Sequence, residues 1–127
     1  CPLVLCHKQR AKANVVANMT IIGDVKDKNV VLVDDMIDTA GTICKAANHM
    51  KENGAKTVRA LASHAIMSGP ACQRVMDSAL EEVIFSDSIP FDVEKCPKAT
   101  IITIASLFAD TIKRVHGNMS ISSQYLI

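Results

Sequence analysis

Short apolar runs alternate along this chain with stretches in which apolar residues recur every three or four positions. The short runs have the length of β-strands, and they predict strands at Pro2–Leu5, Val30–Val33, Thr57–Ala62, Val83–Phe85 and Thr100–Ile104. The run Val30–Val33 is continuous and lies between turn residues and acids, which is typical of a central parallel strand buried on both faces.

Stretches with helical spacing lie between and after these strands. From Gly41 onward, Ile43, Ala46, Ala47 and Met50 fall at i, i+3, i+4 and i+7, and Gly54 is a typical helix stop. A second helix is expected from Pro70, with an apolar face made of Cys72, Val75, Met76 and Ala79. A final helix is expected from Ser106 to His116, with Leu107, Phe108, Ile112 and Val115 inward. This order predicts an α/β fold with a mainly parallel sheet flanked by helices.

The segment after the first predicted strand is polar and basic. Cys6–Thr20 carries Lys8, Arg10 and Lys12 and shows no clear periodicity. We therefore interpret residues 7–20 as a flexible flap and residues 1–127 as a single domain.

Composition narrows the classes of function. The 127 residues carry a net charge of +1, with three Phe and one Tyr, which disfavours nucleic acid as a partner. No apolar run approaches the roughly 20 residues that span a bilayer, so no membrane role is expected. The five cysteines are widely spaced, which favours a reducing, cytoplasmic location. Because the chain begins at Cys1, we expect it to be a piece of a longer protein.

The segment Val31–Thr42 carries the most chemistry. A predicted strand leads into Asp34 and Asp35, and a short loop with Thr39 then opens a helix at Gly41. A helix start offers backbone N–H groups to a phosphate, glycine allows close approach, and carboxylates accept hydrogen bonds from sugar hydroxyls or help to hold a metal ion. These features together indicate a sugar-phosphate site.

Two other interpretations remain open from the residues alone. The acids could form an ordinary strand-end turn in which Thr39 caps the helix, and this is as common as a binding loop. The acid pair could also belong to a phosphoacceptor receiver domain, but Asp87, its candidate phosphoacceptor, comes late in the chain.

Val31–Thr42 resembles the phosphoribosyl-diphosphate loop of the type I phosphoribosyltransferase fold. More narrowly, the chain resembles the C-terminal part of ribose-phosphate pyrophosphokinases (phosphoribosyl diphosphate synthetases). The likeness covers almost the whole chain, and it is carried by Lys8-Gln9-Arg10, Lys12-Ala13-Asn14, Ile21–Val25, Asp34–Thr42, His64, Ser68–Ala71, Asp87–Pro90 and Ser120–Ser122.

The resemblance implies transfer of the diphosphoryl group of ATP, with Mg²⁺, to O1 of ribose 5-phosphate, which gives phosphoribosyl diphosphate and AMP. It implies that Lys8 and Arg10 are catalytic flap residues. The ribose 5-phosphate site would consist of Asp34, Asp35, Asp38, Thr39, Ala40, Gly41 and Thr42. Ser120 and Ser122 match an allosteric site at which phosphate can act as an activator, although Ser123-Gln124 departs from the usual tail. The whole enzyme would be a homo-oligomer, a hexamer built of dimers.

Family features that supply the ATP and metal site have no counterpart in this sequence, and no metal ligand is assigned in it. We therefore expect the 127-residue chain alone to be inactive, with its flap disordered or displaced. Two alternatives are kept: a non-catalytic regulatory homologue of the synthetase, and a phosphoribosyltransferase that uses phosphoribosyl diphosphate. The intact Lys8, Arg10 and Asp34–Thr42 argue against the first, and the Lys-x-Arg flap argues against the second.

Overall fold

The computed structural model describes residues 3–12 and 15–124. Pro2 of the first predicted strand, and Ala13 and Asn14 of the flap, lie outside these ranges. The elements in chain order are β1 (Leu5–Lys12), β2 (Val15–Ile22), β3 (Asn29–Ile37), α1 (Gly41–Glu52), β4 (Thr57–Ala65), α2 (Ala71–Asp77), β5 (Glu82–Ser86), η1 (Val93–Lys95), β6 (Ala99–Ile102), α3 (Ala105–His116) and η2 (Ser122–Gln124).

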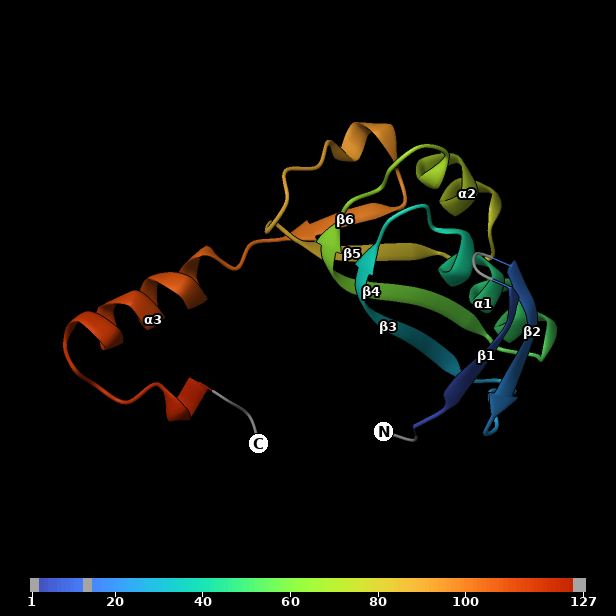
Figure 1. The fold of residues 1–127 in the computed structure, drawn as a ribbon, viewed down its shortest axis with the longest axis horizontal. Helices are drawn as coiled ribbons and strands as arrows, with labels where there is room; N and C mark the ends of the chain where they lie inside the picture. The colour runs from blue at the N-terminus through green and yellow to red at the C-terminus, as the bar shows by residue number, and fades with distance from the viewer. Residues whose placement is uncertain (1–2, 13–14, 125–127) are drawn as a thin grey trace.

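The central feature is a four-stranded parallel sheet in the order β3-β4-β5-β6. Each strand pairs with the next one along the chain, and α1 and α2 provide two of the crossovers (Figure 1). The predicted α/β class with a mainly parallel sheet is confirmed. The expectation that Val30–Val33 forms a central strand is wrong, because β3 is an edge strand of the four-stranded sheet.

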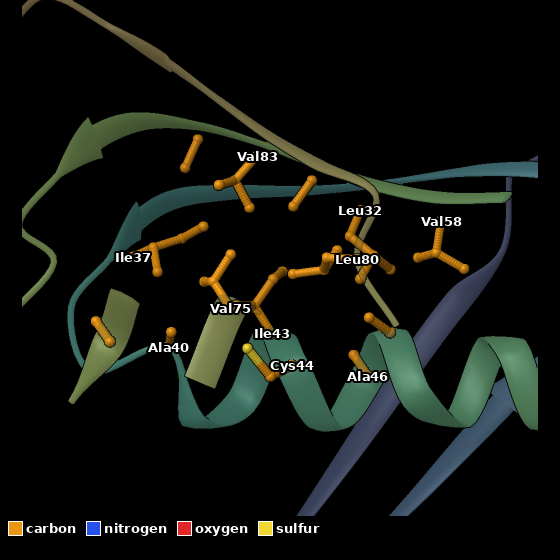
Figure 2. Close-up of a cluster of buried hydrophobic side chains, with 14 of the residues drawn as sticks. Leu32, Ile37, Ala40, Ile43, Cys44, Ala46, Val58, Val75, Leu80 and Val83 are labelled. Atoms are coloured by element: carbon orange, nitrogen blue, oxygen red, sulfur yellow. The ribbon is translucent and has the colours of Figure 1, made fainter. Parts of the chain in front are cut away.

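The hydrophobic core lies between this sheet and the helices α1 and α2. Figure 2 shows Leu32, Val58 and Val83 of the sheet on the side where Ile43 of α1 and Val75 of α2 lie. The predicted inward face of α1 is confirmed, since its four apolar positions are buried. In α2, Val75 is fully buried and Cys72 half-buried, but Met76 is exposed, so that part of the prediction is wrong.

The opposite face of the sheet is open in the described part of the chain. Val31 and Val33 of β3 and Leu61 of β4 are exposed, Val33 to 74%. The prediction that Val30–Val33 is buried on both faces is therefore wrong. The physical reason is that α1 and α2 both pack on one side of the sheet, so alternate side chains of each strand point away from them.

The last helix has the predicted position but not the predicted environment. α3 extends away from the sheet (Figure 1). Leu107, Phe108, Ile112 and Val115 are exposed, Ile112 to 65%, so the prediction that they point inward is wrong. Their spacing indicates an amphipathic helix, but α3 buries none of its residues here.

The segment interpreted as a flap forms an antiparallel hairpin of β1 and β2. Its register shifts between Gln9 and Arg10 and again between Arg10 and Lys12, which accounts for the absence of a clean alternating pattern. Of the described part of the strand predicted at Pro2–Leu5, only Leu5 lies in β1, because Leu3 and Val4 precede it.

Candidate functional site

The candidate site begins inside β3. Asp34 and Asp35 were expected just after a strand, but β3 continues past them to Ile37, and Asp34 is in register with Ala62 of β4. Asp34 Oδ1 accepts a hydrogen bond from the N–H of Asp35 (3.0 Å), and Asp35 Oδ1 accepts one from the N–H of Met36 (2.8 Å). Both side chains are exposed, so these short local bonds hold two adjacent carboxylates at the surface.

The loop after β3 turns sharply at Ala40. This residue is buried and has a left-handed backbone, with φ at 58°, and α1 starts at Gly41. The helix has no side-chain cap, so the interpretation in which Thr39 caps it is not supported. The first N–H groups of a helix have no intrahelical acceptor, and the start of a helix carries positive potential. An uncapped start next to two carboxylates suits a ligand that has both an anionic group and hydroxyl groups.

Asp38 is held by the segment that follows β4. Its carboxylate accepts a hydrogen bond from the hydroxyl of Ser68, and its carbonyl accepts one from the Ser68 N–H (3.0 Å). The N–H of Met67 donates to the carbonyl of Ile37 in the same way (3.0 Å). These bonds give Asp38 a role in shaping the loop, which explains a carboxylate so near a predicted phosphate position.

Sequence analysis missed Arg74, whose side chain reaches this loop from another helix, 35 positions along the chain from Thr39. Its Nη1 donates to the carbonyl of Thr39 at 2.8 Å, from the last turn of α2. The same nitrogen lies 3.4 Å from the position that a Cβ on Gly41 would occupy. No local pattern could have identified this contact, because it joins residues 35 positions apart.

A second polar group lies at the carboxyl ends of β4 and β5. His64 Nδ1 is 2.8 Å from the hydroxyl of Ser88, which itself donates to the carbonyl of Ser63 (3.0 Å). His64 was interpreted as a hydrogen-bonded loop residue, but it lies inside β4, in register with Met36 of β3, so only the hydrogen bond is as expected. Asp87 accepts hydrogen bonds from the Thr103 hydroxyl and the Ile104 N–H, which hold the pKa of its carboxyl below the usual range. Asp87 thus anchors the start of α3.

The remaining predicted site residues lie elsewhere. Lys8 and Arg10 are on β1, in register with Met19 and Val16 of β2. Ser120 and Ser122 follow α3, and their hydroxyl oxygens are 2.8 Å apart. The structure brings together Asp34, Asp35, Asp38–Thr42 and Arg74, and it keeps the serine tail apart from them (Figure 1).

Two kinds of feature are absent from the described residues, namely a metal-binding cluster and a membrane-spanning helix. Residues 3–12 and 15–124 contain no group of three or more His, Cys, Asp or Glu side chains that could hold a metal ion. Within the same ranges, no helix is long and apolar enough to cross a membrane.

Fold and site together define an α/β protein of the kind that binds ligands past the carboxyl ends of its parallel strands. The sequence matches, over residues 6–126, the family described as phosphoribosyl synthetase-associated domain. The chain belongs to this family.

Known relatives agree with this assignment. The chain is 60% identical to a ribose-phosphate pyrophosphokinase of Porphyromonas gingivalis over 98% of its length, and 52% identical to one of Helicobacter pylori over 97%. The crystal structure of phosphoribosylpyrophosphate synthetase from Mycobacterium smegmatis superposes on 92% of the chain with a TM-score of 0.81 and 42% identity.

The chain spans well under half the length of these relatives. It covers 39% and 38% of the two pyrophosphokinases and 37% of the solved synthetase chain. These matches do not support the narrower expectation that the chain is the C-terminal part of such a protein.

Proposed function

We propose that this chain supplies the ribose 5-phosphate cradle of a ribose-phosphate diphosphokinase. The reaction transfers the diphosphoryl group of ATP to O1 of ribose 5-phosphate and gives phosphoribosyl diphosphate and AMP. The observation that carries the proposal is the path from the exposed Asp34 and Asp35 through the left-handed Ala40 to the uncapped start of α1. Family membership and the names of the relatives support it.

In this proposal, the loop 38–42 binds the 5-phosphate. Backbone N–H groups at the start of α1 donate to the phosphate oxygens, and the lack of a side chain at Gly41 lets the anion approach. Asp34 and Asp35 accept hydrogen bonds from the ribose hydroxyls. Sugar O1 is thereby fixed in position, and such positioning is a large part of catalysis in phosphoryl transfer.

Lys8 and Arg10 on the β1–β2 hairpin are proposed as the catalytic cations. Attack at the β-phosphorus of ATP increases negative charge on its oxygens, and a nearby ammonium and guanidinium stabilise that charge most when water is excluded. Mg²⁺, bound with ATP, would neutralise phosphate charge. Asp34 and Asp35 fit such an ion, because Mg²⁺ is commonly held by one or two carboxylates together with substrate phosphates.

The whole protein, rather than this chain alone, is proposed to be active. A chain that covers 39% of its relative is expected to lack groups that the reaction needs, so the 127 residues alone should bind sugar phosphate and make no product. We further propose that the whole protein is a cytoplasmic homo-oligomer. Ser120 and Ser122 remain candidates for an allosteric phosphate site.

Calorimetric titration of the 127-residue chain with ribose 5-phosphate tests the cradle. We expect saturable binding that Asp34→Asn and Gly41→Ala both weaken. Alanine at position 41 would place its Cβ 3.4 Å from Arg74 Nη1, which is ordinary van der Waals contact, so the fold should tolerate it. Asp92→Asn, at the exposed cap of η1, is the matched control. Binding that survives both site variants would refute the assignment.

Product analysis of the whole protein separates the alternatives. AMP and phosphoribosyl diphosphate formed from ATP and ribose 5-phosphate would identify a synthetase. Binding of the sugar phosphate without turnover would favour the regulatory homologue, and consumption of phosphoribosyl diphosphate with a base would favour a phosphoribosyltransferase.

A further inference from the structure

The loop proposed to bind phosphate is held by one continuous set of bonds from a distant segment. The carbonyls of Ile37 and Asp38 accept from the N–H groups of Met67 and Ser68, both at 3.0 Å, and the Thr39 carbonyl accepts from Arg74. Three consecutive carbonyls are therefore directed toward residues 67–74. Arg74 makes the last of these bonds and the only one of the three that comes from a side chain.

The bond from Arg74 constrains the peptide that enters the left-handed turn. A trans peptide is planar, and its C=O and N–H point in opposite directions. Because the Thr39 carbonyl points at Arg74, the N–H of Ala40 points away from it. Ala40 has a φ of 58°, a left-handed conformation that is unfavourable for any residue with a Cβ. A charge-assisted bond to the preceding carbonyl helps to keep this turn in place.

The position of the guanidinium is electrostatically unusual. Arg74 is in the last turn of α2, but its Nη1 reaches the first residue of α1, where helix N–H groups already give positive potential. Among the described residues, no carboxylate lies within ion-pair distance of Arg74. A cation without a counter-ion beside a helix start raises the affinity of that place for an anion.

We propose that Arg74 is a positioning residue for the sugar phosphate, acting through the Thr39–Ala40 peptide and the positive potential at the start of α1. This inference rests on the proposed function and adds to it a residue outside the 34–42 segment. Arg74 touches the loop carbonyl rather than the reacting atoms, so it should control the affinity for the phosphorylated sugar and leave the chemical step alone.

Steady-state kinetics of the whole protein test the proposal, with ribose 5-phosphate varied at saturating ATP. We expect Arg74→Gln to raise the KM for ribose 5-phosphate about tenfold, which corresponds to about 1.4 kcal/mol. The kcat and the KM for ATP should stay within about twofold of the parent values. Arg59→Gln is the matched control, because Arg59 is an exposed arginine whose ion-pair partners are Glu81 and Glu82.

Rescue experiments exclude a purely structural role. Arg74→Lys keeps the charge and one donor, so it should recover most of the lost affinity. Methylguanidinium added to Arg74→Gly should lower the KM for ribose 5-phosphate in a saturable way, and it should not affect Arg59→Gly. If Arg74→Gln does not fold, the lysine variant and the rescue still decide the question.

Three results would overturn this inference or its basis. An unchanged KM for ribose 5-phosphate in Arg74→Gln would refute the role of Arg74. Equal losses in kcat and in the KM values of both substrates, without rescue, would show that Arg74 only supports the fold. A parent protein that makes no product would refute the proposed function, and that result would be known before any variant is measured.

Discussion

Valine-to-threonine substitutions at two positions of the sheet measure how far the core is confined to one face. Threonine keeps the shape and the strand preference of valine but replaces a methyl group with a hydroxyl. Val58 on β4 is completely buried, and Figure 2 shows it on the side of the sheet that α1 covers. Val33 on β3 is 74% exposed on the other face. The same chemical change therefore probes two opposite environments.

The expected cost follows from burial. Val58→Thr loses a buried methyl group worth about 0.8 kcal/mol and places a hydroxyl in the core at a further cost of about 1–3 kcal/mol. We expect the free energy of unfolding of the 127-residue chain to fall by about 2–4 kcal/mol. Val33→Thr should change it by less than about 0.5 kcal/mol, because water already reaches this side chain.

Urea unfolding followed by far-ultraviolet circular dichroism gives both values. With a slope of about 1.5 kcal/mol per molar urea, the midpoint of Val58→Thr should fall by more than about 1 M while the slope stays constant. The midpoint of Val33→Thr should stay within about 0.3 M of the parent. If Val33→Thr costs as much as Val58→Thr, the outer face of β3 is covered in this chain and the one-sided core is wrong.

Three further predictions address other parts of the fold. Removing residues 105–127 should leave the urea midpoint nearly unchanged, since α3 buries no residue, and a large loss would show that α3 packs on the body. Gly54→Ala should destabilise the chain by about 1 kcal/mol, because Gly54 has φ at +88° and the added Cβ would lie 3.3 Å from Lys26 Cγ. Gly41→Ala is the control, because the backbone at Gly41 is not left-handed. Hydrogen bonds to its carboxylate lower the pKa of Asp87 in the folded chain. The ionised carboxylate therefore stabilises the fold at pH values above the pKa that Asp87 has in the unfolded chain, and this contribution is lost as the pH falls through the lower pKa of the folded chain. Asp87→Asn should therefore show a shallower loss of stability on acidification, and an identical acid profile would contradict the assignment.

Local sequence patterns were sufficient to predict an element whose buried face follows from the spacing of its apolar residues. The positions of Ile43, Ala46, Ala47 and Met50 identify both the existence of α1 and its buried face. The candidate loop was predictable for a related reason, since Asp34–Thr42 is contiguous and each residue type suggests its own chemistry. The end of β3 was placed too early because aspartates usually stop a strand, whereas here pairing with β4 extends it to Ile37.

Burial was mispredicted wherever it depends on a second layer. Val31 and Val33 of β3 and the stripe on α3 are apolar enough to be covered, yet in the described chain they face solvent. Apolar spacing shows which side of an element prefers burial, but a partner element must be present to bury it. The same distinction explains why Arg74 was missed. Arg74 acts on the loop through one hydrogen bond to the carbonyl of Thr39, and only the packing of α2 beside α1 brings those two residues together.

The site therefore has two parts with different origins. The proposed chemistry belongs to the contiguous segment from Asp34 to Thr42. Hydrogen bonds from residues 67–74 hold that segment in its shape. Ser68 and Arg74 hold Asp38 and Thr39 from α2 and the turn before it, so the position of α2 on the core determines the shape of the loop. Val75, next to Arg74 in α2, is fully buried in the core between α2 and the sheet. A substitution that loosens this packing should weaken the proposed sugar-phosphate binding from a distance, even though it leaves every residue of the Asp34–Thr42 segment unchanged.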